Sequence, residues 1–171
     1  GVYENRRLSE AARRLDKASH GYLDAVLKRG DMDGKLASTL LLPTVPGLSC
    51  ERVLLVGLGK EKEFADKAYR DAVRATIKAL GGTGARDAAL YLSDLPVKKR
   101  EADWRAEQAV MVAMEAAYRF DRMKSKRDDS PGNLDRLVLN CERASDKAAM
   151  EAGAARGVAI AHGMTLAKDL G

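Results

Sequence analysis

Four short apolar runs alternate with segments of helical periodicity along this chain. The runs lie at residues 39–42, 52–59, 88–92 and 136–140, and the helical patterns lie at 9–29, 64–80, 103–124 and 146–170. Strands that alternate with long helices favour an α/β fold with a parallel or mixed sheet. The run at 52–59 is continuously apolar, which is typical of a central strand covered on both faces.

Two of the predicted helices contain residues that indicate how the helix begins or packs. Ser9 precedes the first helical pattern as a candidate N-cap, and Gly21 interrupts that pattern. The last segment contains Gly153, Gly157 and Gly163, each of which costs a helix about 0.5–1 kcal/mol relative to alanine. We therefore expect another element to pack very close to the backbone of this helix.

Composition narrows the class of protein. A chain of 171 residues with 46% hydrophobic and 32% charged residues is long enough for one folded domain and is not typical of a disordered chain. No apolar run is long enough for a membrane span, and residues 1–7 have no signal-peptide pattern. The sequence therefore predicts a cytoplasmic protein with no membrane partner.

Catalytic and metal-binding patterns are missing from the sequence. His20 and His162 have no potential ligand at metal-binding spacing, and no serine lies in a Gly-x-Ser-x-Gly motif. Cys50 and Cys141 are too few for a disulfide framework, and we expect them to be reduced, buried thiols. We predict no catalytic residue, no metal ligand and no cofactor in this chain.

The segment Gly57-Leu58-Gly59-Lys60 follows a predicted strand and could present backbone amides to an anion. It lacks the spacing of a P-loop and the third glycine of a dinucleotide fingerprint. We favour a structural turn between a strand and a helix, with an anion site as the alternative.

Basic residues provide the candidate binding surface. The net charge is +5. The candidates for a nucleic-acid or partner surface are Lys98, Lys99, Arg100, Arg119, Arg122, Lys124, Lys126 and Arg127. The set at 119–127 has a structural explanation, because cations stabilise the C-terminus of a helix. For residues 98–100 we favour a solvated face or a contact with an acidic partner, with a phosphate-contacting surface as the alternative.

Six segments together resemble a known family. They are residues 6–9 (RRLS), 15–22 (LDKASHGY), 28–31 (KRGD), 52–61 (RVLLVGLGKE), 118–121 (YRFD) and 167–171 (AKDLG). In this order they resemble the N-terminal domain of cytosol (leucyl) aminopeptidases of the bacterial aminopeptidase A type, and the resemblance runs the length of the chain.

The resemblance implies a domain organisation. Residues 1–145 would form an α/β N-terminal domain related to the macro domain, with a three-layer mixed sheet flanked by helices and its first strand missing. Residues 146–171 would form a long helix leading to a C-terminal peptidase domain that is absent here. That domain would hold two divalent metal ions, zinc, manganese or magnesium, and all catalytic residues, so none is carried over to this chain.

The resemblance also implies partners and a role. The parent would be a homo-hexamer that releases N-terminal amino acids from peptides, preferring leucine, and this domain would serve assembly and access to the active site. A DNA-binding regulatory module of the same protein is the alternative. An ADP-ribose binder is a third hypothesis, based on fold analogy alone.

Overall fold

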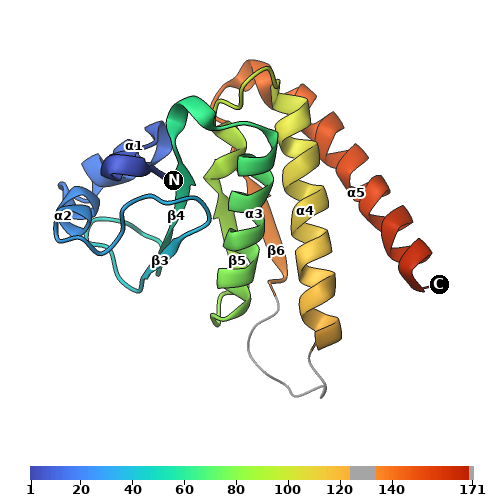
Figure 1. Cartoon of the computed structure of the whole chain (residues 1–171), viewed down its shortest axis with the longest axis horizontal. Coiled ribbons are helices and arrows are strands. Elements are labelled where there is room, and N and C mark those ends of the chain that lie inside the picture. The colour runs from blue at the N-terminus through green and yellow to red at the C-terminus, as the bar shows by residue number, and fades with distance from the viewer. Residues whose placement is uncertain (124–133, 170–171) are drawn as a thin grey trace. The chain divides into compact units, whose positions relative to one another are not determined.

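The computed structural model describes residues 1–123 and 134–169, with side chains at 1–118 and 134–165 (Figure 1). The chain divides into two compact units, Gly1–Thr76 and Ile77–Gly171. The division falls within α3 (Asp66–Gly81). We call them the N-terminal unit and the C-terminal unit and describe each by itself.

The N-terminal unit contains a four-stranded mixed sheet. Its strands are β1 (Val2–Tyr3), β2 (Arg7–Leu8), β3 (Thr39–Leu42) and β4 (Val53–Gly59), in the order β2-β1-β4-β3. β1 runs parallel to β4, whereas the β1–β2 and β3–β4 pairs are antiparallel. β4 is an inner strand with nearly every residue buried, as its apolar sequence predicted. The expected α/β class with a mixed sheet is confirmed.

Two short helices complete the core of the N-terminal unit. They are α1 (Glu10–Ala18) and α2 (Tyr22–Lys28), separated at Gly21, whose φ is +84°. The Ser9 hydroxyl accepts a hydrogen bond from the Ala12 amide at 3.4 Å and caps α1, as predicted. Leu23, Val26 and Leu27 of α2 pack in one cluster with residues of β1, β3 and β4.

The C-terminal unit alternates strands and helices. β5 (Asp87–Leu90) and β6 (Arg136–Leu139) form a parallel pair, α4 (Ala102–Met123) lies between them in sequence, and α5 (Lys147–Asp169) follows. Parallel neighbours need such a crossover connection. Residue pairs 103–153 and 107–157 are in contact, so α4 and α5 run in the same direction, as Figure 1 shows.

The glycines of α5 explain how closely the two helices approach. A Cβ atom at Gly153 would lie 2.0 Å from the Asp103 carbonyl oxygen of α4, and one at Gly157 would lie 2.6 Å from the Glu107 carbonyl oxygen. The predicted close approach is confirmed at both positions. Gly163 differs, because a Cβ there would meet no atom within 4 Å.

Some short elements were not predicted. Besides β1 and β2, the described residues include four 3-10 turns: η1 (Glu4–Arg6), η2 (Glu61–Glu63), η3 (Tyr91–Asp94) and η4 (Ala144–Asp146). The strand expected at 88–92 stops at Leu90, because Tyr91 and Leu92 belong to η3. Among the described residues, no helix has the length and apolarity that crossing a membrane requires.

Candidate functional site

The glycine segment after β4 is a structural contact. The Gly57 amide donates to the Ser38 carbonyl at 2.7 Å, and the Gly59 amide donates to the Gly34 carbonyl at 2.9 Å. A Cβ at Gly57 would lie 1.8 Å from the Lys35 carbonyl oxygen, so only glycine fits beneath this loop. Both amides are already bonded to backbone carbonyls. The structural interpretation of the segment is therefore supported over the anion site.

The histidines and cysteines do not converge on a site. His20 and His162 are exposed, and no group of three or more His, Cys, Asp or Glu residues able to hold a metal ion occurs in the described part of the chain. Both cysteines are free thiols, but Cys50 is exposed and Cys141 is only partly buried. The expectation of two buried thiols was wrong for Cys50, which lies in the irregular connection just before β4 and not within the strand.

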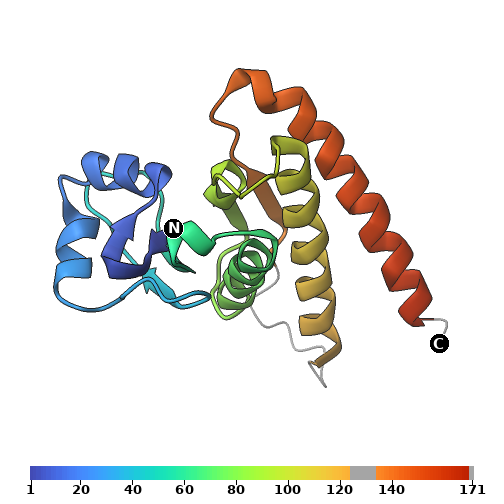
Figure 2. The same cartoon turned by 45° about the horizontal axis from the view of Figure 1, so that its top comes forward.

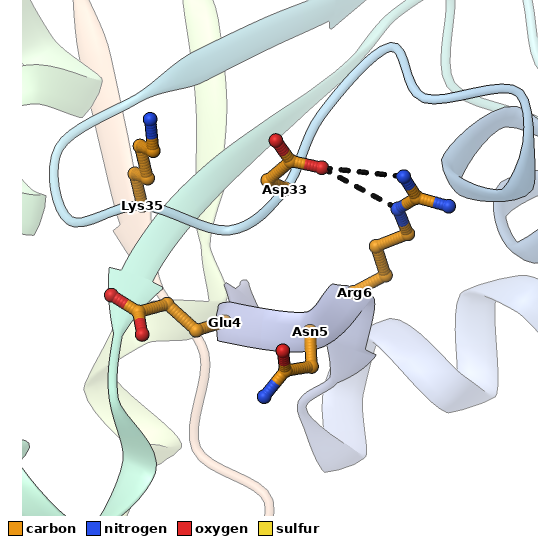
Figure 3. A pocket seen from close by; sticks show the side chains of 5 residues that line it. All are labelled: Glu4, Asn5, Arg6, Asp33 and Lys35. Atoms are coloured by element: carbon orange, nitrogen blue, oxygen red, sulfur yellow. Dashed lines mark hydrogen bonds and ion pairs between the residues drawn. The ribbon is translucent and has the colours of Figure 1, made fainter.

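An open hollow of about 580 Å³ lies on the N-terminal unit between η1 and the loop at 33–35 (Figure 3). Arg6 and Asp33 face each other across it, with the Arg6 Nε 3.4 Å from the Asp33 carboxylate. The side chains of Glu4, Asn5 and Lys35 point in different directions (Figure 3). The hollow is lined by an exposed ion pair, and its polar side chains do not converge on one position where a ligand could bind.

Lys98, Lys99 and Arg100 form a tight turn, which we call the basic turn. Val97 and Arg100 form an isolated β-bridge, the Arg100 amide donates to the Val97 carbonyl at 3.1 Å, and Lys99 adopts a φ of +60°. All three cationic residues of the turn are exposed. Neither Lys98 nor Lys99 has an ion-pair partner among the described residues. The Arg100 guanidinium lies 4.8 Å from the ring centroid of Trp104, a cation–π distance.

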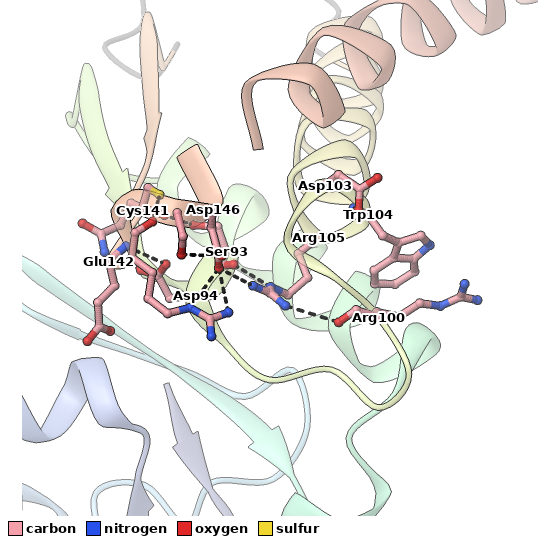
Figure 4. A network of polar contacts seen from close by, with 12 residues as sticks. Ser93, Asp94, Arg100, Asp103, Trp104, Arg105, Cys141, Glu142 and Asp146 are labelled. Atoms are coloured by element: carbon pink, nitrogen blue, oxygen red, sulfur yellow. Dashed lines mark hydrogen bonds and ion pairs between the residues drawn. The ribbon is translucent and has the colours of Figure 1, made fainter. Parts of the chain in front are cut away.

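A buried arginine, Arg105, is hydrogen-bonded to the backbone of the basic turn (Figure 4). Arg105, on the first turn of α4, is 6% exposed. Its Nε donates to the Ser93 carbonyl at 2.9 Å, and its Nη1 donates to the Arg100 carbonyl at 3.3 Å. Its Nη2 lies 3.8 Å from the Asp146 carboxylate. One guanidinium therefore connects η3, the basic turn and η4, the 3-10 turn that precedes α5.

Two η3 side chains extend the network to the end of β6 (Figure 4). The Ser93 hydroxyl lies within hydrogen-bonding distance of the Leu90 carbonyl (3.0 Å) and the Asn140 carbonyl (2.8 Å). The Asp94 carboxylate accepts from the Asn140 side-chain amide and, at 3.0 Å, from the Glu142 amide. The basic turn is thus linked through Arg105 to a hydrogen-bond network that includes η3 and the end of β6. This arrangement can present positive charge at a defined place, but it pairs no nucleophile with a base.

The rest of the predicted basic surface lies outside the described residues. This holds for the side chains of Arg119 and Arg122, and for Lys124, Lys126 and Arg127 entirely. Sequence reasoning also missed Arg105. The sequence does contain a signal for the burial of Arg105. This residue lies three residues after Ala102 and four before Ala109, and this helical spacing places it on the buried face of α4. A cation at a core position must find buried acceptors.

The sequence of this chain matches the model of a known protein family. The model of the cytosol aminopeptidase family, N-terminal domain, matches residues 1–127. The chain belongs to the cytosol aminopeptidase family. The resemblance noted from the six sequence segments is therefore confirmed.

Members of the cytosol aminopeptidase family align with the whole chain. It is 54% identical over 171 residues to a probable cytosol aminopeptidase of Chromobacterium violaceum and 48% identical to one of Dechloromonas aromatica. All of this chain is covered in both alignments, but only 33% and 34% of the relatives. The chain thus spans about a third of the length of the relatives that it matches.

Solved structures show the same fold. A mutant of tomato leucine aminopeptidase superposes with a TM-score of 0.63 at 20% identity, over 97% of this chain and 31% of that one. The bottromycin maturation enzyme BotP in complex with Mn gives a TM-score of 0.61 at 22% identity, over 95% of this chain and 28% of that one. At these identities the likeness shows the fold alone.

Proposed function

We propose that this chain is the non-catalytic N-terminal part of a metal-dependent leucyl aminopeptidase. The match of residues 1–127 to the family's N-terminal domain carries the proposal. The aminopeptidase relatives are about three times as long as this chain, which leaves room for a separate peptidase domain after it. Residues 1–145 are then the N-terminal domain, and residues 146–171 are the helix that leads to the peptidase domain.

The described residues do not fit a divalent metal ion, because they contain no group of three potential ligands. We therefore assign none of them a step in peptide hydrolysis. The two metal ions, zinc or manganese, belong to the following domain in this proposal. The role of this chain is to support assembly of a cytoplasmic homo-hexamer and to shape the access of peptides to its active sites.

The test compares the chain with the full-length protein, each supplied with Mn²⁺ or Zn²⁺ and a leucine p-nitroanilide substrate. We expect the full-length protein to release p-nitroaniline, to lose activity with a chelator, and to sediment as a hexamer. We expect the chain alone to release none. Turnover that follows the isolated chain through purification, or an inactive full-length protein loaded with either metal, would overturn the proposal.

Binding of DNA is a second candidate function, favoured by the basic turn. Lys98 and Lys99 are exposed in a hydrogen-bonded turn and have no acidic partner in the described part of the chain, so their charges are available to phosphates. Each phosphate contact contributes about 0.9 to the slope of log affinity against log salt. A partner recognised in this way would be an anionic polymer, here duplex DNA.

The DNA test uses the double variant Lys98→Glu and Lys99→Glu in the full-length protein. We expect weaker duplex binding and a salt slope smaller by about 2, since two phosphate contacts are lost. The matched control is Lys62→Glu with Lys78→Glu, which makes the same change in net charge at exposed positions elsewhere. Equal losses in the two double variants, or no binding by the unmodified protein, would reject the DNA role.

A further inference from the structure

Trp104 is the single tryptophan of the chain and lies in the first turn of α4. In both views α4 lies between the β5–β6 pair and α5 (Figures 1 and 2). Ala102 and Ala106 are on its buried face, and Asp103 meets Gly153 of α5. At about 100° per residue, Trp104 lies about 200° from Ala102 and about 100° from Asp103 around the helix. It is therefore on neither of these faces, and it stays partly exposed.

Arg100 and Trp104 together form a flat surface, which we call the stacking pair. The exposed Arg100 places its guanidinium 4.8 Å from the centroid of the indole ring, and both side chains point away from the hydrogen bonds of Arg105 (Figure 4). The Arg100 backbone is held on both sides, because its amide donates to the Val97 carbonyl and its carbonyl accepts from Arg105. Guanidinium and indole planes are surfaces on which another flat ring can stack.

The charge beside the stacking pair is positive. Lys98 and Lys99 precede it in the basic turn and are exposed. Two acidic residues lie close in sequence. Glu101 is exposed, whereas the Asp103 carboxylate is bonded to Arg156 at 2.9 Å. Residues 98–101 thus carry three cations and one carboxylate, so the surface next to the stacking pair attracts anions.

A ligand that uses both features must combine flat rings with regularly spaced negative charges. Single-stranded nucleic acid does so, because each base offers a flat face and each nucleotide a phosphate. In a duplex the faces of each base are covered by its neighbours, so the stacking pair could not be used. We propose that the stacking pair and the basic turn bind single-stranded nucleic acid, with a base on Trp104 and Arg100 and phosphates on Lys98 and Lys99. The inference requires neither peptidase activity nor duplex binding.

The test compares two labelled strands on the full-length protein: an oligothymidylate of about 12 nucleotides and an abasic strand of the same length. Both carry the same phosphates, so the ratio of their Kd values isolates the contribution of the bases. We expect the unmodified protein to bind the thymidylate about tenfold more tightly than the abasic strand. Because the ratio is taken within one protein, a variant that is partly unfolded shifts both Kd values equally and leaves the ratio unchanged.

Three variants separate stacking from charge. Trp104→Leu should bind the two strands about equally and keep the salt dependence of the unmodified protein, since it removes a ring and no charge. Trp104→Phe keeps an aromatic ring and should retain much of the preference for the thymidylate. The double variant Lys98→Glu and Lys99→Glu should bind both strands more weakly, with a salt slope smaller by about 1.4, and should keep the preference.

Equal affinity of the unmodified protein for the two strands would overturn the stacking pair, and so would an unchanged preference in Trp104→Leu. A duplex of the same length is measured alongside. If the duplex binds while the two single strands bind equally, the basic turn is a duplex site and the inference is wrong. A base preference without duplex binding would keep the inference and reject the duplex role. Binding of no strand at low salt would reject both.

Discussion

Each of the two units of this chain is stabilised internally by a different kind of contact. The N-terminal unit has a core of large aliphatic residues from α2 and β4, and its ion pairs, such as Lys28–Asp24 and Arg13–Glu10, lie on the surface. The C-terminal unit relies on small residues that bring α4 and α5 close together, and it buries the guanidinium of Arg105. Exposed ion pairs contribute little to stability. A buried charge within a hydrogen-bond network therefore distinguishes the C-terminal unit from the N-terminal unit.

This contrast predicts which substitutions destabilise each unit most. An aliphatic core tolerates changes of shape better than changes of volume, whereas a close backbone approach tolerates no added atom. A buried polar network fails when one member is removed, because its partners are left unsatisfied. The single tryptophan, Trp104, lies in the C-terminal unit and provides a local fluorescence probe of that unit.

The largest effect is expected for Gly153→Ala. The added Cβ would lie 2.0 Å from the Asp103 carbonyl oxygen, so α4 and α5 must move apart. We expect a loss of about 3 kcal/mol in the free energy of unfolding, measured by urea denaturation with Trp104 fluorescence. The control is Gly163→Ala, which meets open space and should be neutral or slightly stabilising. Equal effects of the two substitutions would contradict the close packing of the helices.

The next largest effect is expected for Arg105→Met. Methionine keeps much of the volume but leaves the Ser93 and Arg100 carbonyls without their donor. We expect a loss of about 2–3 kcal/mol. The matched control is Arg156→Met, which removes exposed ion pairs to Asp103 and Glu107 and should have a much smaller effect. A larger effect at Arg156 would show that the surface pairs, and not the buried network, hold the C-terminal unit.

A corresponding change in the N-terminal unit is Gly57→Ala. Its Cβ would overlap the Lys35 carbonyl oxygen, but that oxygen belongs to a loop, which gives way more easily than a helix. We therefore expect a loss of about 2 kcal/mol, seen by far-UV circular dichroism. If the Trp104 fluorescence transition stays where it is in the unmodified chain, the two units unfold independently. If the circular dichroism and Trp104 fluorescence transitions shift together, the two units unfold as one cooperative unit despite their different contacts.

The elements with strong hydrophobic patterns could be predicted from the sequence. β3, β4, β6 and the long helices follow from their patterns, and the glycines of α5 indicated its close neighbour. β1 and β2 could not be predicted, because strands of two residues have no periodicity and are defined only by their pairing. Tyr91 and Leu92 belong to η3, where the Ser93 hydroxyl approaches the Leu90 carbonyl.

The candidate site was predicted only at its exposed part. The basic turn could be found because consecutive cations in a loop are visible in the sequence. The part of its support formed by Ser93, Asp94 and Asn140 could not be found, because nothing in the sequence shows that η3 meets the end of β6. Residue type alone also gave the wrong burial for Cys50, since burial depends on whether the residue enters the strand.

The smallest effect at neutral pH, and a selective effect at alkaline pH, is expected for Tyr3→Phe. Tyr3 is buried against Phe64, with ring centroids 5.9 Å apart. Burial raises the pKa of its phenol above the usual value of 10.0, and the charge of Glu61 adds to the shift. Since the folded state binds this proton more tightly, its stabilising contribution is complete below pH 10 and is lost as pH rises through the folded-state pKa.

Phenylalanine has no phenolic proton to lose. As the pH rises from about 8 to about 11, a range that brackets the reference tyrosine pKa of about 10, the variant should therefore lose less stability than the unmodified chain. The measurement is the difference in melting temperature between the two proteins at each pH, followed by circular dichroism. Lysine deprotonation affects both proteins equally and cancels in this comparison. A variant that loses stability in parallel with the unmodified chain would show that the Tyr3 hydroxyl ionises as freely in the folded state as in the unfolded one. The alkaline sensitivity of the N-terminal unit would then have to arise from its surface charges, which the contrast between the units treats as minor.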